Sequence, residues 1–347
     1  MEFNIAFIGF GVVGQGLAEI LLEQEEFLKK NYDFHFKVVA ISDTVKGSWY
    51  KRSGLDLKKM LDLVKENGNL KGYGEGLEGW NSIKTIEETN ANLILEVAWT
   101  DLKTGEPAIT HVKTALNNKK HVVMTNKGPI ALASKELLDL AKKNDVEMRF
   151  EGTVLSGTPA LNLGLNNLAG AGITKAKGIV NGTTNYILSE MEKGLSYEDA
   201  LKQAQELGYA EADPTADVEG FDALGKIVIL ANTVMGANLS KEDTPCEGIT
   251  KITAEDIAKA KEEGYRWKLI AGAEIKKDGS VDAYVRPEKI PLSHPLANIM
   301  GPTNALTYTT KYVDDVTIVG PGAGKLPTGF ALLSDILDIN RLLSKKE

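Results

Sequence analysis

Cysteine, histidine, clustered basic residues and long hydrophobic runs are all scarce in this sequence. Its 347 residues include one cysteine, Cys246, and four histidines scattered along the chain. A single cysteine cannot form an internal disulfide, which favours a reducing, cytoplasmic location. The histidines provide no closely spaced His/Cys set for zinc and are interpreted as structural or surface residues. With 40 basic against 48 acidic side chains and no Lys/Arg stripe, nothing indicates nucleic-acid binding.

Membrane insertion and secretion are not expected either. The most apolar long stretch, residues 227–239, is interrupted by polar residues and is shorter than the roughly 20 residues that span a bilayer. The N-terminus lacks a basic segment before its apolar stretch, so no signal peptide is expected. The composition, 43% hydrophobic and 25% charged, is typical of a globular protein, and the length predicts about two domains.

Short apolar runs alternate with helical patterns in the first 150 residues. The runs are interpreted as strands and cover residues 4–8, 36–41, 92–97, 121–125 and 147–150. Strands that alternate with helices predict parallel βαβ units, so we expect an open Rossmann-type parallel sheet. The glycine-rich stretch from about 45 to 90 is interpreted as a surface excursion from this sheet, not as a separate domain.

The pattern changes after residue 150. A Gly/Asn-rich stretch leads into two predicted helices, each begun by a capping Ser or Thr with an acid three residues later, at Ser196 and Thr253. Short β-rich runs follow at 269–275, 280–285 and 306–319. The first two are joined across an Asp-Gly turn, which predicts an antiparallel hairpin and hence a second, α+β domain.

The predicted fold class is therefore α/β, with a Rossmann-type domain and a second α+β domain. We expect the dinucleotide-binding domain to comprise residues 1–135 and 318–347, because an amphipathic helix at 331–343 can return to it. The second domain then comprises residues 136–317.

A glycine loop follows the first predicted strand. Gly9, Gly11 and Gly14 have the G-x-G-x-x-G spacing between a strand and a helix. The first glycine permits a tight turn, the second lets the backbone approach a pyrophosphate, and the third lets helix and strand pack closely. The N–H groups of the first helical turn, at Val12 and Val13, then face the phosphates. A merely glycine-rich turn is the alternative, but the flanking strand and helix favour dinucleotide binding.

Asp43, at the end of the second predicted strand, is the residue expected to select the dinucleotide. Its carboxylate could accept hydrogen bonds from ribose hydroxyls and would repel a 2′-phosphate, which favours NAD. An acidic insertion around residues 23–32 accounts for its unusually long separation from the glycine loop. Lys46, Lys51 and Arg52 lie close enough in sequence to bind a 2′-phosphate instead, so NADP remains the alternative.

Five carboxylates gather in residues 211–222, directly before the most apolar helical stretch. Asp222 and Lys226 are four residues apart and so share one helical face. They can be an ordinary surface ion pair, with the other acids complementing the helix N-terminus. The apolar run that begins after Lys226 indicates instead a buried, partnered lysine, and such a lysine can donate a proton to a carbonyl that is being reduced.

Two further segments follow predicted strands of the parallel sheet. Lys127 comes directly after the strand at 121–125, and ligands of open α/β sheets bind beyond the carboxyl ends of strands. We therefore expect Lys127 near the glycine loop, with an exposed loop lysine as the alternative. Residues 151–159 join a carboxylate to a kinked, glycine-containing backbone, which can aim carbonyl oxygens at a hard cation such as Na⁺.

Taken together, these segments resemble a homoserine dehydrogenase. The motifs occur in the family's order and cover most of the chain, at residues 9–14, 125–129, 151–159, 181–186, 208–226, 320–324 and 327–328. The resemblance implies reversible reduction of L-aspartate 4-semialdehyde to L-homoserine by NAD or NADP, a step of threonine and methionine biosynthesis. It also implies a homodimer built on the sheet of the second domain.

The resemblance further implies a role for individual residues. The catalytic residues are expected to be Lys226, Lys127 and Asp222. The substrate-binding residues are expected to be Glu211, Asp217, Asp222, Gly182, Thr183 and Tyr209. The cofactor-binding residues are expected to be Gly9, Gly11, Val12, Val13, Gly14, Asp43, Thr100, Lys127, Gly322 and Gly324. A Na⁺ site is expected at Glu151, Val154, Ser156 and Thr158, the last three through their carbonyls.

Two other functions remain open. An aldehyde-oxidising dehydrogenase that forms a thioester needs a cysteine nucleophile, and Cys246 lies far in sequence from every motif. A non-catalytic dinucleotide sensor would be expected to have lost Lys127, Asp222 or Lys226, and all three are present. Because the chain ends soon after its last predicted helix, we expect neither a regulatory domain nor a fused aspartate kinase, and hence no feedback by threonine.

Overall fold

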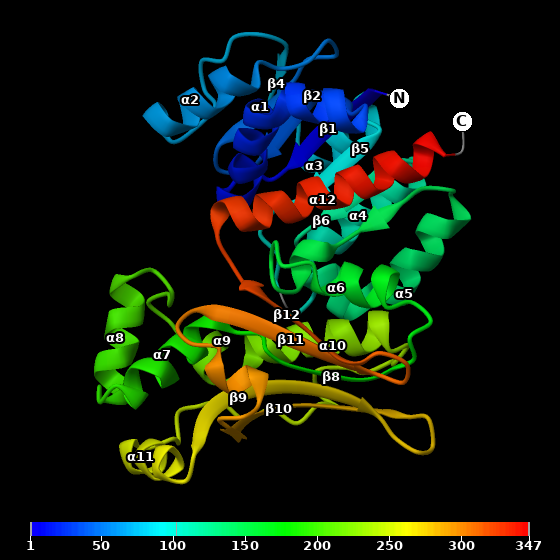
Figure 1. The fold of residues 1–347 in the computed structure, drawn as a ribbon. Helices are drawn as coiled ribbons and strands as arrows, with labels where there is room; N and C mark the ends of the chain where they lie inside the picture. The colour runs from blue at the N-terminus through cyan, green and yellow to red at the C-terminus, as the bar shows by residue number, and fades with distance from the viewer. Residues whose placement is uncertain (1, 102, 346–347) are drawn as a thin grey trace. The chain divides into compact units, whose positions relative to one another are not determined.

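The computed structural model describes residues 2–101 and 103–345 and divides into two compact units (Figure 1). The first unit contains the described residues up to Gly157 and from Gly324 onward, and the second is Thr158–Ala323. The expected boundaries, 135 and 318, differ from these. Helix α5 (Lys127–Lys143) packs on α4 (Ala108–Asn117), and strand β7 (Met148–Arg149) pairs with β6 (His121–Met124), so both α5 and β7 belong to the first unit.

The first unit is built on a seven-stranded sheet with the order β4-β3-β2-β1-β5-β6-β7. All five predicted strands are present and parallel, and those not yet given are β1 (Glu2–Ile8), β2 (His35–Asp43) and β5 (Leu93–Glu96). The chain passes from β1 to β2 on one side and later to β5 on the other. The strand order therefore reverses at β1 and β5, and ligands of such sheets bind beyond the carboxyl ends of those strands.

The glycine-rich excursion adds strands to this sheet. We expected a wholly parallel sheet, but the sheet is mixed. Strands β3 (Gly47–Tyr50) and β4 (Leu77–Glu78) add antiparallel pairs at its edge. Helix α2 (Leu57–Asn67) lies between them, with Asp56 as its N-cap. The Trp49 and Tyr73 rings, 5.4 Å apart, are buried in the core of the unit. The excursion is thus part of the first unit, as predicted.

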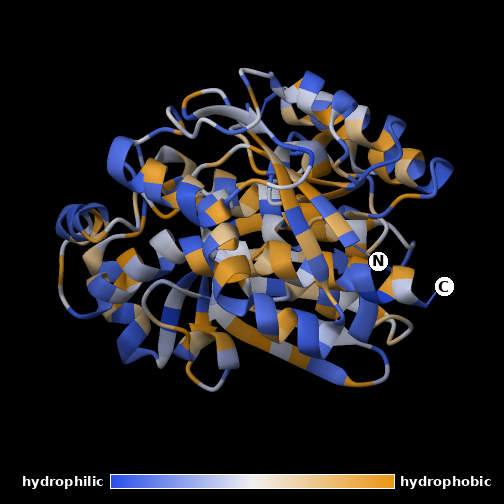
Figure 2. Ribbon diagram, turned by 90° about the horizontal axis from the view of Figure 1, so that it is seen from above, coloured by the Kyte–Doolittle hydropathy of each residue, from blue (hydrophilic) through white to orange (hydrophobic). Residues whose placement is uncertain are grey.

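Two helices from opposite ends of the chain pack closely in the first unit. A Cβ at Gly16 of α1 (Val12–Tyr32) would lie 2.3 Å from the Lys325 carbonyl oxygen, and one at Gly329 of α12 (Lys325–Ser344) would lie 2.6 Å from the Leu17 nitrogen. Leu332 and Ile336 of α12 complete the core around the sheet. The predicted C-terminal helix therefore does return to the first unit. Figure 2 shows that hydrophobic residues predominate in the central strands, whereas the helices carry both hydrophilic and hydrophobic residues.

The second unit is built on an antiparallel sheet with the order β10-β9-β8-β11-β12. The predicted hairpin is formed by β9 (Tyr265–Ile275) and β10 (Val281–Pro291). The run at 306–319 is not one strand but a second hairpin, β11 (Thr303–Thr310) and β12 (Asp314–Pro321), because the chain turns at 311–313. Strand β8 (Ile173–Ile179) was not predicted, since its Lys and Gly residues do not give an apolar run.

Helices α7 (Gly182–Glu192), α10 (Phe221–Val234) and α11 (Ala254–Glu262) pack on this sheet. Ser196 and Thr253 cap α8 (Tyr197–Glu206) and α11 as predicted. The shorter helices of the described chain are α3 (Ser82–Glu88), η1 (Glu151–Thr153), α6 (Ala160–Asn162), η2 (Leu163–Asn167), α9 (Thr215–Val218) and η3 (Pro295–Asn298). Within residues 2–101 and 103–345, no helix is both long and apolar enough to cross a membrane.

Candidate functional site

The glycine loop connects β1 to α1 in a conformation that requires glycine. Gly9 has a φ of +94°, and a Cβ there would lie 2.6 Å from the Val97 carbonyl oxygen at the end of β5. At Gly14 a Cβ would lie 3.2 Å from the Gly9 oxygen, which explains the close packing of helix and strand. Gly11, the N-cap of α1, has an ordinary φ of −73°, and no described atom lies within 4 Å of the position of its Cβ. The loop thus leaves space where backbone N–H groups begin the helix.

The Asp43 carboxylate ties the end of β2 to this loop. Its Oδ2 accepts a hydrogen bond from the Phe10 N–H (2.7 Å), and its Oδ1 accepts from the N–H groups of Val45 (2.9 Å) and Lys46 (2.8 Å). Burial works against the charged form, but the hydrogen bonds from Lys46, Phe10 and Val45 hold the pKa of Asp43 below its ordinary value. A carboxylate has further lone pairs, so these contacts leave room for a ribose hydroxyl.

Lys127 begins helix α5 and does not lie in a loop as considered above; its side chain is half-buried. The residue before it, Asn126, was not singled out from the sequence. Its side-chain amide donates to the Ala98 carbonyl (2.9 Å) and to the Thr100 hydroxyl. Asn126 thereby ties the start of α5 to the segment that follows β5, where Thr100 was predicted to contact the cofactor.

A buried pair supports the same region of the first unit. Glu96, the last residue of β5, is fully buried, and its Oε2 lies 2.7 Å from Nδ1 of the buried His111 on α4. The other oxygen accepts from the Ala98 N–H (3.0 Å). His111 is therefore structural, as interpreted from the sequence. A strand-ending Glu was the available signal for this pair, but its partner, fifteen residues later, could not be identified from spacing.

In the second unit, Lys226 lies on α10 and is 7% exposed. Its Nζ donates to Asp222 Oδ2 and to the Val180 carbonyl oxygen, both at 2.6 Å. The pair of Glu247 and Lys251 has the same four-residue spacing, but its side chains are 54% and 81% exposed. The Asp222–Lys226 pair is thus a buried contact and not the surface ion pair considered as its alternative.

Asn181, the N-cap of α7, brings a second carboxylate to this pair. Its Nδ2 donates to Asp217 Oδ1 (2.7 Å) and to Asp222 Oδ2 (3.0 Å). Burial raises the pKa of Asp217, and the negative charge of Asp222 raises it further, while the Asn181 amide opposes both effects. The sequence analysis included Asn181 only in the motif at residues 181–186; its capping position was the signal that could have distinguished it. Together Asp217, Asp222 and Lys226 form the carboxylate–lysine cluster.

The other predicted substrate residues lie around α7. Gly182 is its first residue, and a Cβ there would lie 2.6 Å from the Pro302 oxygen. The Thr183 hydroxyl donates to the Tyr209 carbonyl (2.6 Å), and the half-exposed Tyr209 ring lies 5.0 Å from that of Tyr186. The exposed Glu211 makes no side-chain hydrogen bond or ion pair within the described residues, so the structure does not join it to the cluster.

The returning glycine loop borders a buried amide. A Cβ at Gly322 would lie 2.2 Å from Nδ2 of Asn304, and one at Gly182 would lie 3.3 Å from Oδ1 of Asn304. The Asn304 side chain is fully buried, and neither of its polar atoms has a hydrogen-bond partner among the described residues. Gly322 belongs to the second unit, whereas Gly324, with a φ of +122°, belongs to the first.

The predicted cation-binding segment contains a strained turn. Leu155 and Ser156 have φ values of 55° and 53°, a left-handed conformation that is costly for residues other than glycine. The Glu151 side chain is 2% exposed, and the buried Val154 lies in the same segment. Thr158 is the first residue of the second unit. In the described chain no three His, Cys, Asp or Glu side chains cluster as metal ligands, so a site here would depend on carbonyl oxygens.

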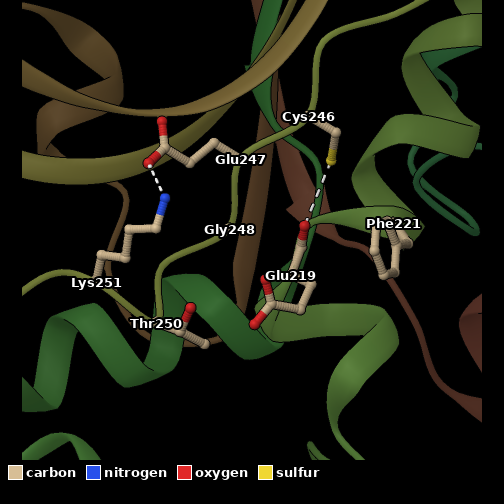
Figure 3. A pocket seen from close by; sticks show the side chains of 7 residues that line it. All are labelled: Glu219, Phe221, Cys246, Glu247, Gly248, Thr250 and Lys251. Atoms are coloured by element: carbon tan, nitrogen blue, oxygen red, sulfur yellow. Dashed lines mark hydrogen bonds and ion pairs between the residues drawn. The ribbon is translucent and has the colours of Figure 1, made fainter. Parts of the chain in front are cut away.

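Figure 3 shows a surface pocket of the second unit, and none of its lining residues belongs to the carboxylate–lysine cluster. It is lined by Glu219, Phe221, Cys246, Glu247, Gly248, Thr250 and Lys251. The Cys246 thiol donates to the Glu219 carbonyl (3.4 Å), and burial raises its pKa above the ordinary value. A thiol that is protonated at neutral pH and lies outside the carboxylate–lysine cluster does not fit the thioester chemistry of the competing dehydrogenase.

Comparisons with known proteins identify the family. The family model for the homoserine dehydrogenase NAD-binding domain matches residues 9–151, and that for homoserine dehydrogenase matches residues 159–337. An NAD(+)-dependent homoserine dehydrogenase of Pseudomonas canavaninivorans is 43% identical over 100% of this chain and 98% of its own length. A homoserine dehydrogenase of Methanocaldococcus jannaschii is 45% identical over 97% of this chain and 98% of its own length.

A solved structure shares the fold as well. A hyperthermophilic archaeal homoserine dehydrogenase in complex with NADPH superposes with a TM-score of 0.84 at 30% identity, covering 99% of this chain and 98% of that chain. The two family models together match most of both units, and the relatives match nearly end to end. The chain therefore belongs to the homoserine dehydrogenase family and is a nicotinamide-dinucleotide-dependent oxidoreductase.

Proposed function

We propose that the two units divide the interconversion of L-aspartate 4-semialdehyde and L-homoserine between them. The first unit binds the dinucleotide through the glycine loop, and the second binds and protonates the amino acid through the carboxylate–lysine cluster. The observation that carries this assignment is the buried Lys226, held at 2.6 Å by Asp222.

The glycine loop fits the pyrophosphate of a dinucleotide. The open space at Gly11 and the N–H groups of the first turn of α1 suit phosphate oxygens. Asp43 suits the adenosine ribose. When bound, the dinucleotide supplies or accepts the hydride. Lys127 and Thr100, at the carboxyl ends of β6 and β5, complete the cofactor-binding set, with Gly322 and Gly324 in the returning loop.

Lys226 acts at the substrate oxygen. Hydride addition to the aldehyde carbon places negative charge on the carbonyl oxygen, and the Lys226 ammonium stabilises this charge and then donates the proton. In the reverse direction the same amine accepts the hydroxyl proton. Asp222 and the Val180 carbonyl hold Nζ in place for both directions.

The remaining side chains bind the ends of the amino acid. Asp217 and Glu211 supply negative charge for its ammonium group. Lys127, which belongs to the first unit, is the second catalytic lysine of the proposal. Gly182, Thr183 and Tyr209 line the substrate. Glu211 needs to approach from an exposed position, so its contribution is expected to be smaller than that of Asp217.

The cofactor preference and the cation are finer parts of the proposal. Asp43 supports NAD, since its negative charge repels a 2′-phosphate. The relatives differ in their cofactor: one is described as NAD(+)-dependent, and one solved relative is in complex with NADPH. The strained turn at 155–156, with Glu151, Val154, Ser156 and Thr158, supports Na⁺ binding through carbonyl oxygens. A cytoplasmic location remains a prediction from the single cysteine.

Homoserine oxidation by the purified protein tests the proposal. NADH and NADPH formation is followed separately, by absorbance, with and without Na⁺. Turnover with NAD and little with NADP supports both the reaction and Asp43 as the selector. A preference for NADP supports the proposed reaction but shows that Asp43 does not select the dinucleotide. Dinucleotide binding without turnover of homoserine supports a non-catalytic dinucleotide sensor instead.

A homodimer built on the sheet of the second unit is also part of the proposal. Lys177 and Glu288 form an ion pair (2.7 Å) on this sheet, and the Arg286 guanidinium lies 4.1 Å from the centre of the Tyr284 ring. Rows of partly exposed side chains on a sheet face suit a second copy of the same face. Light scattering during size-exclusion chromatography distinguishes a dimer near 75 kDa, twice the chain mass of 37.6 kDa, from a monomer.

A further inference from the structure

We propose that Asn181 is a positioning residue of the substrate site, whose side-chain amide holds two carboxylates side by side: Asp217, for the ammonium group of the substrate, and Asp222, for Lys226. The inference rests on the proposed roles of these two acids. It assigns a separate role to a residue that the sequence analysis included only in the motif at residues 181–186.

The direction of the Asn181 amide is fixed by the helix that it caps. Its Oδ1 accepts hydrogen bonds from the Thr184 N–H and the Thr184 hydroxyl, both at 2.9 Å, so the oxygen points toward the N-terminus of α7. The amide nitrogen is turned the other way. Its two hydrogens are donated to Asp217 Oδ1 (2.7 Å) and Asp222 Oδ2 (3.0 Å). Because Asn181 is 4% exposed, water cannot easily replace either contact.

A neutral donor suits this position better than a cation. The charged groups that act on Asp217 are Asp222 and Lys226, both on α10, whereas α7 contributes the Asn181 amide and the Thr183 hydroxyl. Lys226 already contacts Asp222 at 2.6 Å. The amide stabilises two neighbouring negative charges without adding a positive one, so the pair keeps the net charge that attracts an ammonium group.

The same contacts predict a measurable role in titration. Burial and Asp222 raise the pKa of Asp217, and the hydrogen bond from Asn181 opposes them. Without that bond the pKa of Asp217 rises further. Since only the ionised carboxylate attracts the substrate ammonium, homoserine binding should then fail at a higher pH than in the wild type.

Two variants separate the amide donor from the helix cap. Serine caps helices about as well as asparagine, so Asn181→Ser should unfold within about 5 °C of the wild type, whereas Asn181→Asp buries a third carboxylate beside Asp217 and Asp222 and should be less stable. In Asn181→Ser we expect the KM for homoserine to rise about tenfold or more, with the KM for the dinucleotide unchanged. In Asn181→Asp the rise should be larger, because a third carboxylate is added. The acid limb of kcat/KM should move up by about one pH unit.

A double variant links the effect to Asp217. In Asp217→Asn the acid limb due to Asp217 disappears, and adding Asn181→Ser should then change the pH profile little. The inference is overturned if folded Asn181→Ser and Asn181→Asp keep the wild-type homoserine KM and acid limb. It is also overturned if both variants weaken homoserine and dinucleotide equally while losing thermal stability, since that result indicates a merely structural role.

A spectroscopic readout keeps the inference separate from the proposed function. The pKa of Asp217 can be followed by carboxyl ¹³C NMR of the full-length protein in the wild type and in Asn181→Ser. If the wild type fails to oxidise homoserine, the proposed function fails, but a higher Asp217 pKa in Asn181→Ser still supports the positioning role. An unchanged pKa contradicts that role whatever the activity.

Discussion

The proposed binding sites of the two units are formed by different parts of their residues. In the first unit the site depends on backbone: Gly9 adopts a conformation that other residues resist, and Gly11 leaves space before the N–H groups of α1. In the second unit it depends on side chains, with Asn181, Asp217, Asp222 and Lys226 joined by hydrogen bonds of 2.6–3.0 Å. A backbone site is sensitive to added atoms, whereas a side-chain network is sensitive to the loss of one group.

The largest effect is expected from removal of the buried lysine. Lys226→Met should lower kcat by roughly a hundredfold to ten-thousandfold, because the proton donor at the substrate oxygen is lost. The matched control is Lys251→Met, since Lys251 lies in an ion pair of the same spacing but is 81% exposed at its side chain. The control should keep kcat within about twofold. Steady-state kinetics of both variants checks this, and equal kcat values would remove the assigned role of Lys226.

The glycine loop allows stability and binding to be separated. Gly9→Ala should destabilise the fold by about 1–3 kcal/mol, because an alanine there combines a positive φ with a contact of 2.6 Å to the Val97 oxygen. Gly11→Ala should leave stability within about 1 kcal/mol and yet raise the dinucleotide KM about tenfold or more, since the new methyl group enters the space proposed for the pyrophosphate. Chemical denaturation and NADH fluorescence titration measure the two effects, and a Gly11→Ala protein with wild-type affinity would contradict the backbone site.

Asp43 is the side chain proposed to select the dinucleotide at the backbone site. Asp43→Asn should raise the activity ratio of NADP to NAD about tenfold, because the charge that repels a 2′-phosphate is removed. It should also lose stability in a pH-dependent way. The folded-state pKa of Asp43 lies below the ordinary 3.8, so its contribution is fully present above that pH and is lost as the pH falls through the folded value. The free energy of unfolding of wild type and Asp43→Asn is measured at pH 7 and pH 3. A difference between the two proteins that is the same at both pH values would contradict this account.

A small gain in stability is expected when the buried amide of Asn304 is removed. Unlike Asn181, it has no hydrogen-bond partner within the described residues, and a buried amide without partners costs free energy. Asn304→Leu should therefore raise the free energy of unfolding by about 1 kcal/mol. Denaturant unfolding measures this change. A loss of stability instead would show that the amide is satisfied in solution, for example by an internal water.

The backbone site could be predicted from the sequence more fully than the side-chain network. Glycine spacing fixes a conformation locally, so Gly9, Gly11 and Gly14 were identified without knowledge of distant residues. The pairing of Asp222 with Lys226 was also local, at four residues. Asn181 contacts acids that lie 36 and 41 residues later, and no spacing rule connects them.

In the fold, too, local sequence patterns could be predicted and other features were missed. Strands bounded by turns and apolar on both faces, such as β1 and β6, were recognised from short apolar runs. Strand β8 was missed because it carries lysines on one face, and the hairpin of β11 and β12 was merged because its turn contains no glycine or proline. The boundary predicted at residue 135 precedes the division after Gly157, although the strand predicted at 147–150 already belonged to the sheet of the first unit.

One pair of measurements tests the division between the units most directly: the KM values for NAD and for homoserine in Gly11→Ala and in Asp217→Asn. The account predicts that Gly11→Ala raises the KM for NAD and leaves that for homoserine near the wild-type value, and that Asp217→Asn does the reverse. If each variant raises both KM values equally, the dinucleotide and the amino acid are not bound by separate sets of residues, and the central claim fails.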